Sequence, residues 1–431
     1  MPNHASARAR RFRAYVERLT TALGHQDRHG PLRDYVTGLC LPGERKSIEP
    51  MAARVDPRHV RARHQSMHHF IANAGWDDAA VLRVARETVL AALERHGPVA
   101  AWVVDDTGIP KKGQHSVGVA RQYCGVLGKQ DNCQVAVSVS VAHERASVPV
   151  AYRLYLPEAW AKDRSRRRPA GVPDTVEFRP KWQIALEQLT QLRAEGVPTA
   201  PVVADAGYGV VTAFRDALTA QGLAYAVGIS TETSVWGPGR APLPAPKYRG
   251  VGRPPTLMRR TRRQRPLSVK TLAKHLPASA GRTVTWRQGT RGAMRSRFAA
   301  LRVHPAHRDD WRSTPRPEEW LLIEWPPSEA APIKSWLSTL PPTATRADLV
   351  QLAMLRWRIE RDYQELKDEL GLDHFEGRGW RGFHHHASLC IAAYAFLAAE
   401  RLALSPPAPL AFLRPARLPK GFTPRGAPRA S

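Results

Sequence analysis

The stretch VAAWVVDD, residues 99–106, decides the fold class, because a short apolar run that ends in acidic residues is typical of a buried strand. NCQVAVSVSVAH (132–143) then alternates with the period of a strand, and VPVAYRLYLPEAW (148–160) is a third, less regular strand. A helical pattern follows and ends at Gly196, and VPTAPVVADAGYG (197–209) is another strand that ends in an acid. Three strands, a helix and a strand predict an α/β core built around a mixed sheet.

A helical pattern precedes this core. RFRAYVERLTTALG (11–24) and DDAAVLRVARETVLAALERHG (77–97) repeat apolar residues every three or four positions. We therefore predict a helical domain over residues 1–96, and its basic middle segment makes DNA binding its expected role. The basic segment between the two patterns (56–76) could contain a helix-turn-helix, or it could be an amphipathic bundle helix with a solvated basic face.

A basic block follows the first part of the core. From Thr233 to Arg308 the chain has 18 Lys and Arg residues and no Asp or Glu. Strand-like pieces with alternating Trp, Val and Phe favour a folded, mostly β insertion over 231–345 rather than a disordered segment. Such a block could be a solvated face, but its length favours contact with phosphates, and Arg262 and Arg263 within it are candidate DNA-binding residues.

The insertion divides the α/β core into two parts. We predict its first part over residues 97–230 and its second, helical part over 346–404. The last 27 residues, 405–431, hold seven prolines, five basic residues and no acid, which predicts a disordered tail.

The overall charge points to a polyanionic partner. Lys and Arg number 65 against 38 Asp and Glu, which gives a net charge of +27 and a pI near 10.8. Counterion release makes nucleic acid the expected ligand. The alternatives are a ribosomal or membrane-surface protein, or the arginine content of a GC-rich genome. Because we find neither a signal peptide nor an apolar run near 18 residues, we expect a cytoplasmic, nucleoid-associated protein that does not bind a membrane.

Two predicted strands end in carboxylates. WVVDDTG offers Asp105 or Asp106, and VVADAGYG offers Asp205. Ligands in α/β proteins bind in the crevice beyond the carboxyl ends of strands. A strand-terminal aspartate can equally be a turn residue or a helix cap, so each acid is weak evidence taken alone.

A third carboxylate lies in the helical pattern RWRIERDYQELK. At about 100° per residue, Glu360 lies about 40° from Arg356 and about 20° from Lys367, so the three share one face. An ion-paired surface helix explains part of this spacing. Three converging carboxylates suit two divalent cations, and Mg²⁺ prefers such oxygen ligands. In the metal-free protein the three acids would repel each other, so we expect a raised carboxylate pKa.

With these residues in place, the chain resembles the DDE transposases of bacterial insertion sequences, in particular the insertion-sequence family numbered 701, a relative of the family numbered 4. The stretches that carry the resemblance are VVDDTGIPKKGQHSVGVARQYCGVLGKQDNCQVAVSVS, YLPEAWAKDRSRRRPAGVP, VVADAGYG and LRWRIERDYQELKDELGLDHFEGRGWRGFHHHASL. The resemblance extends over most of the chain, from about Asp105 to Leu404.

The resemblance implies an RNase H-like core with a β insertion, and a Mg²⁺-dependent DNA transposase that cuts at transposon ends and joins them to target DNA. Two Mg²⁺ ions, for which Mn²⁺ can substitute, would bind Asp105, Asp205 and Glu360; D-x-[ST] favours Asp105 with Thr107, and Asp106 is the alternative. The implied partners are double-stranded DNA, as inverted repeats and target, and a second copy of the chain, as a dimer on DNA.

The family signature Y-x2-R-x3-E-x6-K falls on Arg356, Glu360 and Lys367, with Ala353 at the tyrosine position. It implies that Arg356 and Lys367 contact DNA phosphates. Lys111 and Lys112 follow the first strand and either touch DNA or lie in a solvated turn. The run His384–His386 is a weak metal candidate, because adjacent histidines on a helix point in different directions; a role near phosphate, or plain surface, is the expectation.

Overall fold

The computed structural model describes residues 4–289, 292–307 and 309–404, so the predicted tail at 405–431 lies outside the described residues. The strands are β1 (Ala101–Pro110), β2 (Ala120–Cys124), β3 (Lys129–Ala142), β4 (Ser147–Leu154), β5 (Val202–Ala204), β6 (Tyr225–Ile229), β7 (Ser234–Trp236), β8 (Leu267–Ser268), β9 (Arg282–Gly289), β10 (Gly292–Pro305), β11 (Glu319–Glu324) and β12 (Lys334–Ser338).

Helices occur at both ends of the chain and between the strands. They are α1 (His4–Leu23), α2 (His29–Cys40), α3 (Ile48–Val55), α4 (Val60–Ala72), α5 (Asp78–Glu94), α6 (Glu158–Ala161), α7 (Arg164–Arg167), α8 (Lys181–Ala194), α9 (Ala206–Gly209), α10 (Thr212–Ala220), α11 (Val269–Lys274), α12 (Arg346–Met354), α13 (Trp357–Asp368) and α14 (Trp380–Leu404). Short 3-10 turns lie at Gln26–Arg28, Gly125–Leu127, Ala278–Ala280 and Asp309–Trp311.

One mixed sheet joins the strands of the described chain. Its order is β2-β3-β1-β5-β6-β12-β11-β10-β7-β8, with β4 paired to β3 and β9 to β10. β1, β3 and β4 form an antiparallel set, whereas β5 and β6 run parallel to β1. This arrangement confirms the predicted α/β fold with an RNase H-like mixed sheet.

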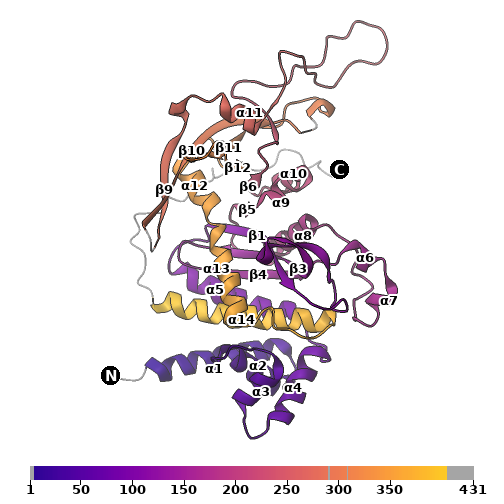
Figure 1. The fold of residues 1–431 in the computed structure, drawn as a ribbon, viewed down its shortest axis with the longest axis vertical. Coiled ribbons are helices and arrows are strands. Elements are labelled where there is room, and N and C mark those ends of the chain that lie inside the picture. The colour runs from indigo at the N-terminus through magenta and orange to yellow at the C-terminus, as the bar shows by residue number, and fades with distance from the viewer. Residues whose placement is uncertain (1–3, 290–291, 308, 405–431) are drawn as a thin grey trace, which may run out of the picture.

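The predicted β insertion extends the same sheet. After β6 the chain builds β7 to β12, and β12 returns to pair antiparallel with β6. In Figure 1 these strands rise above the core, and α12 leads from them down to α13. The mostly β character of the insertion and the helical N-terminal part are confirmed as fold features; the exact domain boundaries stay predictions.

β1 differs from its predicted end. We expected the strand to stop at its two acids, but it continues to Pro110 because it pairs with β3 over its whole length, from Ala101 opposite Ala142 to Pro110 opposite Cys133. Its pairing with β5 on the other edge ends earlier, at Val104. Asp105 and Asp106 therefore lie within β1, in the part of the strand that pairs with β3 but no longer with β5.

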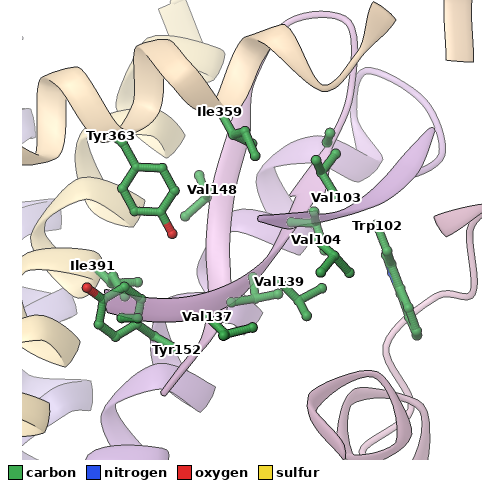
Figure 2. Packing of buried hydrophobic residues seen from close by; sticks show 14 of the residues in the cluster. Trp102, Val103, Val104, Val137, Val139, Val148, Tyr152, Ile359, Tyr363 and Ile391 are labelled. Atoms are coloured by element: carbon green, nitrogen blue, oxygen red, sulfur yellow. The ribbon is translucent and has the colours of Figure 1, made fainter. Parts of the chain in front are cut away.

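Helices cover both faces of this core. Figure 2 shows Ile359 and Tyr363 of α13 pointing toward the strands that carry Val139 and Val148. Burying a side chain of this size stabilises the fold by about 1.5–3 kcal/mol. On the opposite face α8 packs against β3, where Gln188 donates a hydrogen bond of 3.0 Å to the carbonyl of Val137.

Helix α14 lies between the sheet and the N-terminal helices (Figure 1). It contacts α5 and β4, and Arg11 of α1 donates two hydrogen bonds of 2.6 Å to Glu400. Among the described helices it alone is long and apolar enough to cross a membrane, with a mean hydropathy of 1.5 over an 18-residue window. Since 72% of that window is buried inside the protein, α14 serves as its central core helix.

The histidine run is part of this core, which corrects the expectation of a surface position. His384, His385 and His386 are all buried, and each bonds to backbone carbonyls. The amide of Leu154 donates to Nε2 of His384, so its Nδ1 carries the proton donated to Trp380. Burial lowers the pKa of His384 to about 3 and those of His385 and His386 to about 4.

These histidines predict acid lability. Their folded pKa values lie below the ordinary value of about 6.5, so the unfolded chain binds more protons. The contribution of these histidines to the free energy of unfolding should be constant above pH 7 and fall between pH 6.5 and 4, by up to about 1.4 kcal/mol per pH unit for each histidine. Urea unfolding at pH 7.5, 6 and 5 measures this slope.

His384→Gln should reduce the slope, because glutamine keeps a donor and an acceptor but gains no proton. His68→Gln is the matched control, since His68 is exposed on α4. Equal slopes in the wild type and in the His384 variant would contradict the explanation.

Candidate active site

Strand register places two of the predicted carboxylates side by side. The parallel pairing of β1 with β5 ends with Val104 opposite Ala204. Asp105 and Asp205 are the next residues after this last pair. Both therefore lie at the same edge of the sheet, beyond the carboxyl end of β5, which is where α/β sheets bind ligands.

Asp105 is buried, which is unfavourable for an ionised carboxylate. Its side chain is 12% exposed, and its Oδ1 accepts a hydrogen bond of 2.9 Å from the amide of Asp106. Burial raises the pKa of Asp105 to about 7; Arg356 lowers it, and the neighbouring carboxylates of Asp106 and Asp205 raise it further. The predicted increase is confirmed, although burial rather than mutual repulsion is its largest cause.

Asp106 points away from this cluster. Adjacent residues in a strand face opposite sides of the sheet, and Asp106 forms an ion pair with Lys181 at the start of α8. Asp105 lies on the side of α13 instead. Of the two alternatives, Asp105 is thus the one that the structure brings to the other predicted residues.

Asp205 is both a helix cap and a member of the carboxylate cluster. Its Oδ1 caps α9 by accepting hydrogen bonds from the amides of Gly207 (2.9 Å) and Tyr208 (3.4 Å). Its Oδ2 lies 3.7 Å from the guanidinium of Arg356. The cap orients the side chain, so the second oxygen faces the cluster.

The third carboxylate, that of Glu360, lies just after a break between two helices. We expected one helical stretch, but α12 ends at Met354 and α13 begins at Trp357, with Arg356 as the capping residue. Glu360 occupies the first turn of α13, and its side chain is 69% exposed. This position leaves the glutamate free to turn toward a ligand.

The guanidinium of Arg356 lies at the centre of the cluster. Its Nη2 is 3.1 Å from Oδ2 of Asp105 and 3.7 Å from Oδ2 of Asp205, and its Nη1 is 3.7 Å from Oε1 of Glu360. Three carboxylates from three different elements thus share one cation.

The donor set fits a divalent cation. Mg²⁺ and Mn²⁺ prefer carboxylate oxygens, and a dication would stabilise the ionised form of the buried Asp105. Within residues 4–289, 292–307 and 309–404, no three His, Cys, Asp or Glu side chains are close enough to form a ready metal cluster. In the protein alone the arginine therefore provides the neutralising charge.

The predicted lysines differ in accessibility. Lys367 is only 9% exposed, and its ammonium donates a hydrogen bond of 2.9 Å to the carbonyl of Gly108 in β1. Lys111 donates to the carbonyl of Phe375 at 2.8 Å and is half-buried. Rather than reaching solvent as expected of phosphate contacts, Lys367 fixes the last turn of α13 to β1. Lys112 is exposed.

Arg262 and Arg263 are also exposed, in the loop that precedes β8. They belong to the insertion and form no ion pair within the described part of the chain. The structure does not bring them into contact with the carboxylate cluster.

Sequence reasoning missed a chain of hydroxyl groups beneath the cluster. Tyr363 of α13 donates a hydrogen bond to Ser138 of β3, and Ser138 donates to the backbone carbonyl of Asp105 at 3.3 Å. The signal in the sequence was the alternation of serine with valine in VSVSV (137–141), which places Ser138 and Ser140 on one face of the strand. These bonds set the distance between α13 and β1.

Comparisons with known proteins identify a family for the chain. A family model described as DDE superfamily endonuclease matches residues 18–293, a range that contains both aspartates but not Glu360. The probable transposase for insertion sequence element IS701 of Microchaete diplosiphon is 32% identical over 145 residues, which are 34% of this chain and 35% of the relative. The chain thus spans about a third of the length of that curated relative. The resemblance to insertion-sequence transposases is confirmed.

A solved structure is also similar. The piggyBac transposase synaptic complex with hairpin DNA matches with a TM-score of 0.40 and 10% sequence identity. The match covers 88% of this chain and 66% of the solved chain.

The two roles of Asp205 can be separated by substitution. Asp205→Ala removes the cap of α9 and should lower the free energy of unfolding by about 0.5–2 kcal/mol. Asp205→Asn keeps a cap oxygen and should lie within a few tenths of a kcal/mol of the wild type. Both remove the charge that faces Arg356, so urea unfolding of the pair isolates the cap; equal losses would refute its contribution.

Proposed function

The chain belongs to the DDE superfamily endonucleases, and we propose that it is a DNA transposase that cuts at the ends of an insertion sequence and joins them to target DNA. The observation that carries the proposal is the meeting of Asp105, Asp205 and Glu360 around one cationic group. The excess of basic residues in the chain supports DNA as the substrate.

In this proposal, Asp105, Asp205 and Glu360 hold two Mg²⁺ ions, for which Mn²⁺ can substitute. When bound, such ions activate a water molecule or a 3′-hydroxyl and stabilise the leaving oxygen of a phosphodiester. The protein fixes the positions of the two aspartates, because β1 and β5 are held together by backbone pairing. The burial of Asp105 excludes bulk water from its carboxylate. Glu360 supplies the mobile ligand from the solvent side.

Arg356 and Lys367 take different parts in the reaction. Arg356 is within reach of the phosphate of a strand at the carboxylates, where its planar guanidinium can bind two oxygens. Lys367 acts as a positioning residue, because its hydrogen bond to Gly108 holds α13, and with it Glu360, against β1.

The remaining basic residues would hold the DNA on either side. Lys112 follows β1, and Arg262 and Arg263 lie in the insertion, so all three are accessible to a duplex. Lys111, which is tied to Phe375, would contribute its charge at longer range. Because transposition brings two ends together, we propose a dimer on inverted repeats, acting in the cytoplasm on nucleoid DNA.

Two alternatives use the same site. A structure-specific nuclease of this fold would cleave DNA without joining it, and a catalytically inactive relative would only bind. The three carboxylates favour catalysis over the inactive relative. Strand transfer to a target duplex separates the transposase from the nuclease.

Substitution of the exposed carboxylate tests the proposal. Glu360→Gln should reduce Mg²⁺-dependent nicking of the element's end by at least about 100-fold, because it removes a carboxylate that would hold the metal ions on which cleavage depends. The side chain is 69% exposed, so its amide should leave the fold intact. Nicking of a labelled end in Mg²⁺, in Mn²⁺ and in chelator measures the effect.

Glu369→Gln, at the end of α13, is the control, since Glu369 is also exposed but lies about 2.5 helical turns from Glu360. Wild-type nicking by the Glu360 variant would refute the proposed role of Glu360. Cleavage by the wild type without any product joined to target DNA would favour the nuclease.

A further inference from the structure

A second cavity lies behind the candidate active site, on the other side of α13. Its volume is about 170 Å³, and its walls come from α13, α14, the turn between β3 and β4, and β9 of the insertion. Arg358 and Asp362 line it, each two residues from Glu360 and thus about 160° around the helix. The cavity is therefore separate from the carboxylate cluster.

Arginine dominates the lining of this cavity. Five arginines surround it, against two carboxylates, those of Asp362 and Glu365. The arginines are Arg145, Arg287, Arg358, Arg361 and Arg401. Bringing five cations together around a space of this size is unfavourable unless anions balance them.

Both carboxylates already have partners inside the protein. Glu365 forms ion pairs with Arg361, at 3.0 Å, and with Arg401. Asp362 is buried and accepts hydrogen bonds from Tyr394, at 2.9 Å, and from Ser147. The charge of Glu365 is thus neutralised by arginines within the wall of the cavity, whereas Asp362 is held by neutral hydroxyl groups.

Two other arginines retain positive charge. Arg287 lies 3.6 Å above the ring of Trp357, and Arg358 donates a hydrogen bond to the carbonyl of Glu144. Neither forms an ion pair with a carboxylate in the described part of the chain, and Nε of Arg358 is buried without a hydrogen-bond partner there. An indole wall and guanidinium groups with donors to spare suit a phosphate, which guanidinium binds with two parallel hydrogen bonds.

We propose that this cavity, the arginine pocket, binds a phosphate group of the DNA backbone. The proposal rests on the proposed function and extends it to a strand segment on the far side of α13 from the scissile phosphate. The volume equals about five water molecules at their liquid volume, enough for one phosphate group. Because Arg287 comes from β9, a bound phosphate would also link the insertion to the helix that carries Glu360.

The salt dependence of DNA binding tests the pocket. The double variant Arg145→Gln/Arg287→Gln removes two pocket arginines outside α13, and a lost phosphate contact should reduce the slope of log Kobs against log[salt] by about 0.9. Arg193→Gln is the charge control, because Arg193 is exposed on α8. Glu360 is kept, and binding to an end duplex is measured without divalent metal.

A second arm uses inorganic phosphate as the probe without DNA. Millimolar phosphate should raise the Tm of the wild type, relative to chloride of equal ionic strength, and should not raise that of the double variant. If phosphate stabilises the wild type but the salt slope is the same in both proteins, the pocket takes free phosphate and the DNA assignment is overturned. If neither effect occurs, the arginines only support the wall of the cavity.

The outcome is independent of the catalytic proposal. An unchanged salt slope together with nicking that requires Glu360 would overturn the pocket and leave the transposase standing. A wild type that neither binds nor nicks the end duplex would overturn both the transposase and the DNA-bound pocket, and the phosphate arm would still report whether the cavity takes a free anion.

Discussion

The parallel pairing of β1 with β5 is the constraint on which the candidate site depends. It joins segments about a hundred residues apart and stops one residue before each aspartate, so Asp105 and Asp205 become neighbours at one sheet edge. Asp105 is buried, and burial together with the neighbouring carboxylates raises its pKa. The site therefore requires a cation, and in the protein alone that cation is the guanidinium of Arg356.

Helix α13 connects the carboxylate site to the rest of the molecule. Its apolar residues rest on the sheet, Tyr363 and Lys367 bond to β3 and β1, and its exposed first turn holds Glu360. The opposite side of the helix faces the arginine pocket, which β9 of the insertion helps to line. One helix thus meets both the carboxylates of the core and the basic residues of the insertion.

Much of the fold and the site could be predicted from local patterns. Alternation, apolar runs and helical periodicity identified the mixed core, and the spacing of Arg356 and Glu360 indicated their common face. The ends of the strands were harder to predict. β1 runs to Pro110 because it pairs with β3, and which strand pairs with β1 is decided by the tertiary structure. The histidines of α14 were placed at the surface because their polarity alone gives no sign that backbone carbonyls will satisfy them.

The sequence by itself determined which residues could carry the chemistry, because residue type and period are local properties. It determined that Glu360 lies one helical turn after Arg356, on the same face of the helix. Only the tertiary structure decided that α13 covers the face of Asp105 while Lys181 covers that of Asp106. It also decided that Lys367 is buried, since burial depends on what the neighbouring strand offers, here the carbonyl of Gly108.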